Sequence, residues 1–180
     1  MMTRIAKSYV FVLFTLEGLL FGCSLILHFT IFLLGVSQEY ERYTHSLLSA
    51  TILLAIPASA FIKDSLRWVA QIRKSPTWMW RTALGIGIYT IVLLLVQWVI
   101  PHNSLDNPMP LAFTAYGAAF GAISCCVLFP VLRRGIFNDA QIIQRFRTSV
   151  IFIGIVFAVV VADRAGYIPH TKTYSDQPGR

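Results

Sequence analysis

The first apolar run, residues 9–36, constrains the fold more than any other part of the sequence. As an α-helix, a run of this length would extend about 42 Å, which exceeds the roughly 30 Å of hydrocarbon in a bilayer. A water-soluble domain of this size has no use for such a segment. Glu17 interrupts the apolar region that a cleaved signal peptide would need, so we expect the run to remain as a membrane span.

The composition points to a membrane protein. Of the 180 residues, 56% are hydrophobic and 13% are charged, whereas soluble domains contain about 25% charged residues. Four further apolar segments follow the first. We therefore predict a single all-α integral membrane domain over residues 1–180, a polytopic helical bundle with five transmembrane helices at residues 9–36, 46–62, 82–100, 110–132 and 148–168.

The net charge of +7 has an explanation in the topology. Eleven of the fifteen Lys and Arg residues fall in the N-terminus and in the connections at residues 63–81 and 133–147, which five spans place on one side. Basic connections stay on the cytoplasmic side, so we predict the N-terminus inside and the C-terminus outside, in a bacterial inner membrane. The lipid bilayer then accounts for the basic charge, and we expect no nucleic-acid partner.

Residues 63–81 combine basic residues with tryptophans. Apolar residues at three-residue spacing indicate that part of this segment is an amphipathic helix. Such a helix lies along the membrane surface, with its tryptophans at headgroup depth. We predict a basic interfacial segment here.

Small residues recur at four-residue spacing in three of the predicted spans. Helices in lipid associate where small residues let their backbones approach, so these stripes predict packing faces. The stripes either pack helices within the chain against one another or contact other proteins of the membrane. Those proteins are other membrane protein subunits or further copies of this chain. The predicted helix-packing residues are Gly18, Gly22, Gly117, Gly121, Gly154, Ala158 and Ala162.

Two ionisable residues, Glu17 and His28, lie inside the first span and share one helix face with Ser24. They are about 16 Å apart along the helix axis, so each needs its own partner. Intramembrane ionisable residues often mark ion paths or ligand sites. The alternative is structural: a protonated Glu17 and a neutral His28, each hydrogen-bonded to a neighbouring helix.

The topology suggests partners for both residues. Glu17 lies in the inner half of the membrane, at the depth of Ser124 and Ser59. His28 lies in the outer part, at the depth of Gln97 and Asp163, which complete the predicted set of intramembrane polar residues. A single histidine on an apolar helix could also ligate a haem or a pigment metal, which makes His28 the candidate cofactor-binding residue.

Catalytic signatures are missing from the sequence, which has no phosphate-binding glycine loop, HExxH or Gly-x-Ser-x-Gly. The four histidines match no metal-binding spacing, so we predict neither a catalytic site nor a metal site and identify no cofactor. The favoured function is non-catalytic: an accessory or scaffold subunit that packs against a larger membrane complex. Alternatives are a small oligomeric transporter or channel that uses Glu17 and His28, and a haem- or pigment-binding subunit with His28 as ligand.

Overall fold

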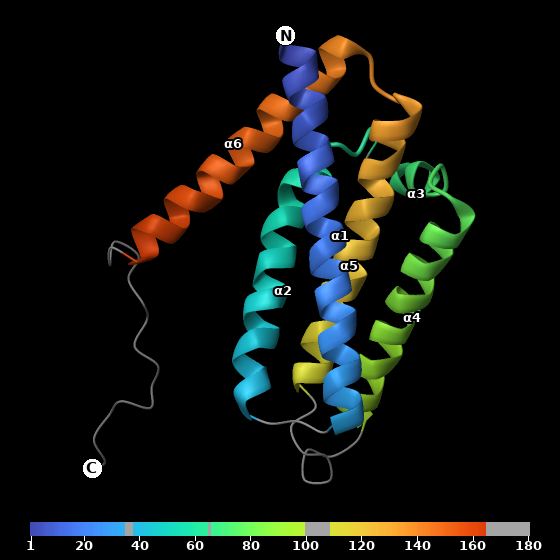
Figure 1. Ribbon diagram of the computed structural model, residues 1–180, viewed down its shortest axis with the longest axis vertical. Helices are drawn as coiled ribbons and strands as arrows, with labels where there is room; N and C mark the ends of the chain where they lie inside the picture. Colours follow the sequence, from blue (N-terminus) through green and yellow to red (C-terminus); the bar gives the residue numbers. More distant parts are fainter. Residues whose placement is uncertain (35–37, 65, 100–108, 165–180) are drawn as a thin grey trace.

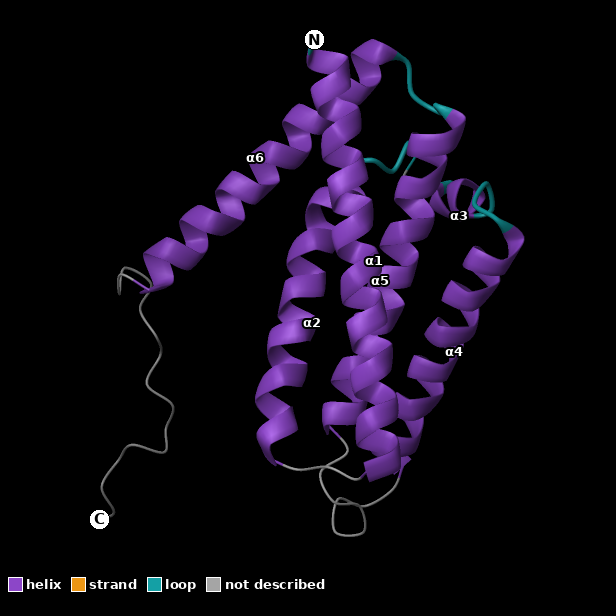
Figure 2. Cartoon of the chain, in the orientation of Figure 1, coloured by secondary structure: helices purple, strands orange, loops and turns teal. Residues whose placement is uncertain are grey.

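The computed structural model describes residues 1–34, 38–64, 66–99 and 109–164. The regular structure in these ranges is helical throughout, as predicted (Figures 1 and 2). The helices are α1 (Met2–Leu34), α2 (Gln38–Ser59), α3 (Trp68–Ile72), α4 (Thr77–Val99), α5 (Met109–Arg134) and α6 (Asp139–Arg164).

Four helical segments are long and apolar enough to cross a membrane: Met2–Leu34, Thr77–Val96, Met109–Arg134 and Asp139–Val159. They belong to α1, α4, α5 and α6, and they indicate an integral membrane protein. The predicted span at residues 46–62 corresponds to α2, which is not among the four. The first turns of α2 are polar and its helix ends at Ser59, so its apolar part is shorter than that of the other helices.

Helix α5 is the centre of the bundle, and α1, α2, α3 and α4 all pack against it (Figure 1). Most of its residues are buried, and most of the buried residues are small. The closest approach is to α1: a Cβ atom on Gly117 would lie 2.8 Å from Ser24 Oγ, and one on Gly121 would lie 3.0 Å from Phe21 Cβ. At Gly121 the added atom would also lie 3.3 Å from the α1 backbone at Glu17 and Phe21, whereas at Gly117 the Ser24 side chain would have to move. The glycines therefore allow the close backbone approach through which helices in lipid associate.

Two polar side chains from the α3 region hold this short helix against α5. Pro130 lacks an N–H group, so the carbonyl of Cys126, four residues earlier, loses its helical donor. The Ser75 hydroxyl donates to this carbonyl at 2.7 Å. The Gln71 amide donates to the carbonyl of Val127 at 3.1 Å and to that of Phe61 at 2.9 Å. The proline in α5 thus creates the acceptor that anchors the connection between α2 and α4.

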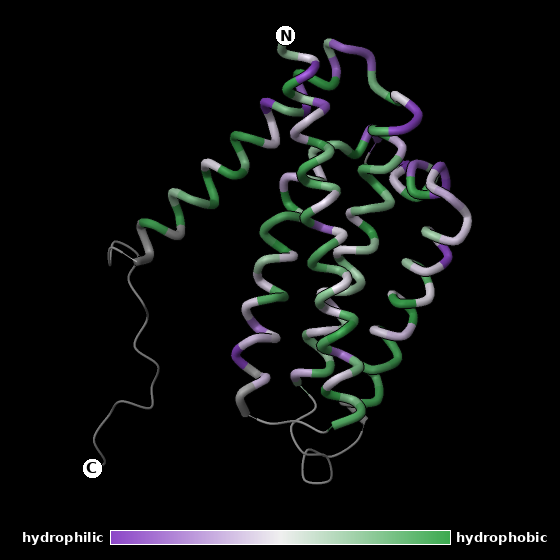
Figure 3. Tube along the Cα trace, viewed as in Figure 1, coloured by the Kyte–Doolittle hydropathy of each residue, from purple (hydrophilic) through white to green (hydrophobic). Residues whose placement is uncertain are grey.

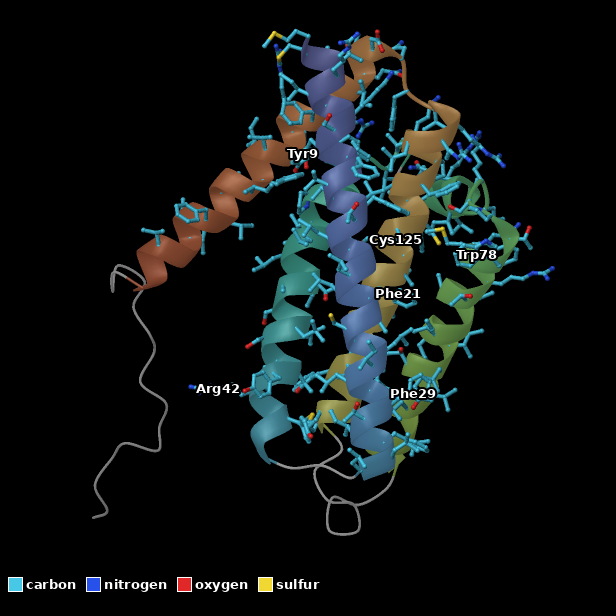
Figure 4. All side chains as sticks on the ribbon, in the orientation of Figure 1. Tyr9, Phe21, Phe29, Arg42, Trp78 and Cys125 are labelled. Carbon is cyan, nitrogen blue, oxygen red and sulfur yellow. The ribbon has the colours of Figure 1, made fainter. Side chains whose placement is uncertain are left out.

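Helix α6 joins the bundle only through its first half (Figure 1). The Tyr9 and Ser149 hydroxyls are 2.7 Å apart, and Ser149 donates to the Pro57 carbonyl at 2.9 Å, which connects α1, α6 and α2. Arg145 donates to the carbonyl of Ala60 at 3.2 Å, just beyond the end of α2. Figure 4 shows Tyr9 on α1 close to the part of α6 that touches the bundle. Beyond Ser149 the helix diverges from α2.

Hydrophilic residues gather at one end of the bundle, where the N-terminus, α3 and the α5–α6 connection meet (Figure 3). Lys7 Nζ is 4.0 Å from Asp139 Oδ1, and Lys63 Nζ donates to the Ile136 carbonyl at 3.4 Å. The three basic stretches of the sequence therefore share one end. Arg42 lies on α2 toward the opposite end (Figure 4).

The interfacial segment differs in detail from the prediction over residues 63–81. Its surface helix is confined to α3, which has only five residues. Helix α4 already starts at Thr77, so Trp78 and Trp80 belong to its first turns. The surface helix is short because Gln71 and Ser75 bind carbonyl groups of α5. Pro76 follows directly and starts helix α4, which runs in the direction of the span.

Candidate functional site

His28 is the centre of the best-defined polar site inside the bundle. Its side chain is only 6% exposed, and both ring nitrogens are hydrogen-bonded to neighbouring helices. Nδ1 is 2.9 Å from Thr114 Oγ1 on α5, and Nε2 is 2.9 Å from the Tyr89 hydroxyl on α4. The imidazole therefore bridges three helices, α1, α4 and α5.

The partners of Thr114 define the direction of these bonds. Its hydroxyl is 3.0 Å from the carbonyl oxygens of Pro110 and Leu111, which can only accept. The Thr114 hydroxyl donates to a carbonyl and so accepts from Nδ1–H of His28. In a neutral imidazole, Nε2 is then the unprotonated nitrogen and accepts from the Tyr89 hydroxyl. The result is a one-way chain of donors from Tyr89 through a neutral His28 to the backbone of α5.

A cavity of about 370 Å³ adjoins this chain between α1, α4 and α5. His28 and Tyr89 are the side chains with polar groups in its wall, and the other walls are apolar. A metal at Nε2 would have to displace the Tyr89 hydroxyl, so a haem or pigment would need that bond to open. The apolar residues of the wall are Leu25, Phe29, Phe32, Ile86, Ala115 and Ala118, with Gly85.

Glu17 lies on the same face of α1, but in a different environment. Its side chain is fully buried, and neither carboxyl oxygen has a hydrogen-bond partner among the described residues. Ser124 faces the carboxyl from α5, yet without the geometry of a hydrogen bond. A buried carboxyl without a partner is expensive, which makes Glu17 the most unusual polar group in the bundle.

Apolar packing separates Glu17 from the basic end of the bundle. Val10 and Leu13, on the preceding turns of α1, are buried in one cluster with Phe61 and Leu128. On the other side of Glu17, Ser24 is fully buried and its hydroxyl also lacks a partner in the described part of the chain. The described residues thus form a closed interface around Glu17 rather than an open channel.

The structure buries some of the predicted polar residues and exposes another. Glu17, Ser24 and His28 are all buried on the face of α1 that meets α5. Ser59 is exposed and donates to the Ile56 carbonyl, so it is no partner for Glu17. The side chains of Gln97 and Asp163, predicted at the depth of His28, lie outside the described residues.

The predicted packing residues also separate into two groups. Gly117 and Gly121 lie in the α1–α5 contact, whereas a Cβ atom on Gly18, Gly22 or Gly154 would meet nothing within 4 Å. Helix α1 contacts α5 through the neighbouring face that carries Glu17, Phe21 and Ser24. On α6, Ala158 is exposed, and the side chain of Ala162 lies outside the described residues.

Sequence reasoning missed Thr114 and Tyr89, the two partners of His28. Thr114 could have been found, because it precedes Gly117 and Gly121 by three and seven residues and so lies on the same face of α5. Tyr89 could not have been predicted as a partner, because nothing in the sequence pattern of α4 distinguishes it from the apolar residues around it. Gln71 and Ser75 were missed as well, although Pro130 indicates that a donor is needed near Cys126.

No group of three or more His, Cys, Asp or Glu side chains in the described ranges is placed to hold a metal ion. Comparisons with protein-family models, with curated proteins and with solved structures find no significant match. The function must therefore be argued from the geometry of this chain alone.

Replacing Tyr89 by Phe tests the bond to His28. The substitution leaves Nε2 buried without a donor, so we expect the free energy of unfolding in mixed micelles to fall by about 0.6–1.7 kcal/mol, the range for hydrogen bonds between membrane helices. Tyr43→Phe is the control, because Tyr43 is 64% exposed. Equal stability of the two variants would contradict the assigned bond.

Proposed function

We propose that this chain is a non-catalytic accessory or scaffold subunit that docks on another protein of the membrane through α6. The observation that supports this function is the course of α6. Its first half is tied to α1 and α2, and its second half leaves the bundle with apolar side chains exposed on every face. A last span that packs only on its own bundle would have no reason to diverge from it.

The small residues of α6 face away from the bundle. With 3.6 residues per turn, Ala158 lies about 180° around the helix from Ser149, whose side chain is fully buried against α1 and α2. Gly154 is on nearly the same side as Ala158, and its Cβ position is open. A second membrane helix could approach closely along this line, because small residues allow backbones to come into contact.

Substitution of Gly154 and Ala158 by Leu tests this docking face. We expect the double variant to lose a specific complex seen for the wild-type protein after extraction in mild detergent, because the bulky side chains prevent close approach. Size-exclusion chromatography with mass spectrometry identifies the complex and its members.

Ile153→Leu with Val156→Leu is the matched control, since these residues lie on the side of α6 that faces the bundle. The control should retain the complex. A wild-type protein that migrates as a lone monomer would contradict the proposal. A complex made only of copies of this chain would replace the accessory subunit with a homo-oligomer.

We further propose that α2 also crosses the membrane, giving five spans with the N-terminus inside and the C-terminus outside. Helix α2 lies beside α1 and α5 along most of the bundle (Figure 1). The three basic stretches share one end, through the Lys7–Asp139 and Lys63–Ile136 contacts. The positive-inside rule places that end in the cytoplasm, and we assign the protein to a bacterial inner membrane.

Cysteine labelling tests this topology. In a variant with Cys23, Cys125 and Cys126 replaced by Ala, a new cysteine at Arg73 should react only with a reagent that enters the cell. A new cysteine at Arg42, on the opposite end of the bundle, should react with an impermeant reagent from outside. Reaction of the Arg73 position from outside only would contradict the topology, and equal accessibility of both positions would contradict the α2 span.

A small proton-coupled transporter is the second candidate, and the unpartnered Glu17 carboxyl is the observation that favours it. Charged or neutral, such a group is costly inside a bilayer and is commonly retained for ion movement. Transport would require the apolar cluster of Val10, Leu13, Phe61 and Leu128 to open, because it closes the interface on the basic side.

Glu17→Gln tests this candidate with almost no change in side-chain volume. If Glu17 carries protons, proton flux into vesicles that contain the purified protein should fall to the level of empty vesicles. Asp64→Asn is the control, because Asp64 is an exposed carboxylate at the surface. The absence of flux in the wild-type protein, or equal flux in both variants, would exclude a proton-carrying role.

A further inference from the structure

An apolar groove runs along α4 from the basic end of the bundle, between α3, α4 and α5. Its volume is about 260 Å³. Trp68 and Ile72 of α3 and Trp80 of α4 line its upper part, and Gly87 and Ile91 of α4 line its lower part, with Ile123 of α5 behind them. We propose that this groove binds one acyl chain of an anionic phospholipid, with the lipid phosphate on Arg73.

The length of the groove fits one leaflet of a bilayer. From Trp80 to Ile91 the helix rises by about 16 Å, and the hydrocarbon of one leaflet is about 15 Å thick. Tryptophan side chains prefer the boundary between hydrocarbon and headgroups, so Trp68 and Trp80 place the upper end of the groove at headgroup depth. An acyl chain in the groove therefore ends near the middle of the membrane.

Arg73 supplies the charge at the mouth of the groove. Its side chain is exposed and makes no hydrogen bond or ion pair with the described part of the chain. The acidic residue of this region, Asp64, is 3.8 Å from Arg67 and lines a separate polar pocket with Gln71 and Lys74. Arg73 therefore has no anion of its own, and a guanidinium binds phosphate well because its donors match the phosphate oxygens.

The walls of the groove are held in place from both sides. Gln71 and Ser75 bind carbonyls of α5 and keep α3 over the start of α4. Gly87 leaves room where a larger residue would fill the groove, since a Cβ atom there would meet nothing within 4 Å. Arg73 is the basic residue among those that line the groove, and apolar walls with a cation at the mouth suit an amphiphile with an anionic head.

The test uses the full-length protein and two lipids with identical acyl chains, phosphatidylglycerol and phosphatidylcholine. Native mass spectrometry after delipidation and re-addition measures which lipid is retained. We expect about fivefold preference for phosphatidylglycerol, the effect of one basic residue on an anionic lipid. Arg73→Gln should reduce this ratio to about one, and Gly87→Leu should lower retention of both lipids.

Two matched variants serve as controls. Arg134→Gln removes a charge from the same end of the bundle, and Gly85→Leu enlarges a nearby glycine of α4 that lines a different cavity. Both should retain the wild-type ratio. Because Arg73 is exposed, its variant reports on the site even if Gly87→Leu does not fold.

Three outcomes would overturn the proposal. The first is an unchanged lipid ratio in Arg73→Gln, and the second is unchanged retention in a folded Gly87→Leu protein. The third is displacement of the lipid by inorganic phosphate alone, which would identify an anion site without an acyl chain. Retention of phosphatidylglycerol in the presence of excess phosphate supports lipid binding. The result is independent of docking through α6, because the groove lies on α4.

Discussion

The close approach of α1 and α5 is the contact on which the rest of the bundle depends. Gly117 and Gly121 bring the α5 backbone against Ser24, Phe21 and the backbone of Glu17. In a bilayer, apolar side chains gain little from leaving lipid, so helices are held together by tight packing and by hydrogen bonds. Because α5 is built of small residues, α2, α3 and α4 can also pack against it.

Polar groups supplement this packing where the helices are interrupted or end. Pro130 frees a carbonyl of α5 that Ser75 binds, and Ser149 binds the Pro57 carbonyl of α2. Arg145 binds a carbonyl just beyond the end of α2. These bonds lie near the basic end, which explains why α3 and the first half of α6 are fixed there. The second half of α6 has no such bonds in the described residues, and it leaves the bundle.

The two ionisable residues of α1 illustrate two ways to bury a polar group. His28 is satisfied on both nitrogens by groups from two other helices, so it contributes to holding α4 and α5 to α1. Glu17 is buried in the α1–α5 contact without any hydrogen bond in the described structure. The hydrogen bonds of His28 are explained by their contribution to stability. The burial of Glu17 without a hydrogen bond lowers the stability of the fold, and packing alone does not explain it.

The sequence by itself determined the helical class, the apolar segments and the grouping of basic residues, because these depend on composition and on the 3.6-residue period. It also indicated that Glu17, Ser24 and His28 share a face, since their spacing requires it. Only the tertiary structure decided which neighbours meet that face. Thr114 and Tyr89 are 86 and 61 residues away from His28 in the chain, and the divergence of α6 depends on where its polar contacts end. These arrangements depend on packing between helices, which a local sequence pattern does not determine.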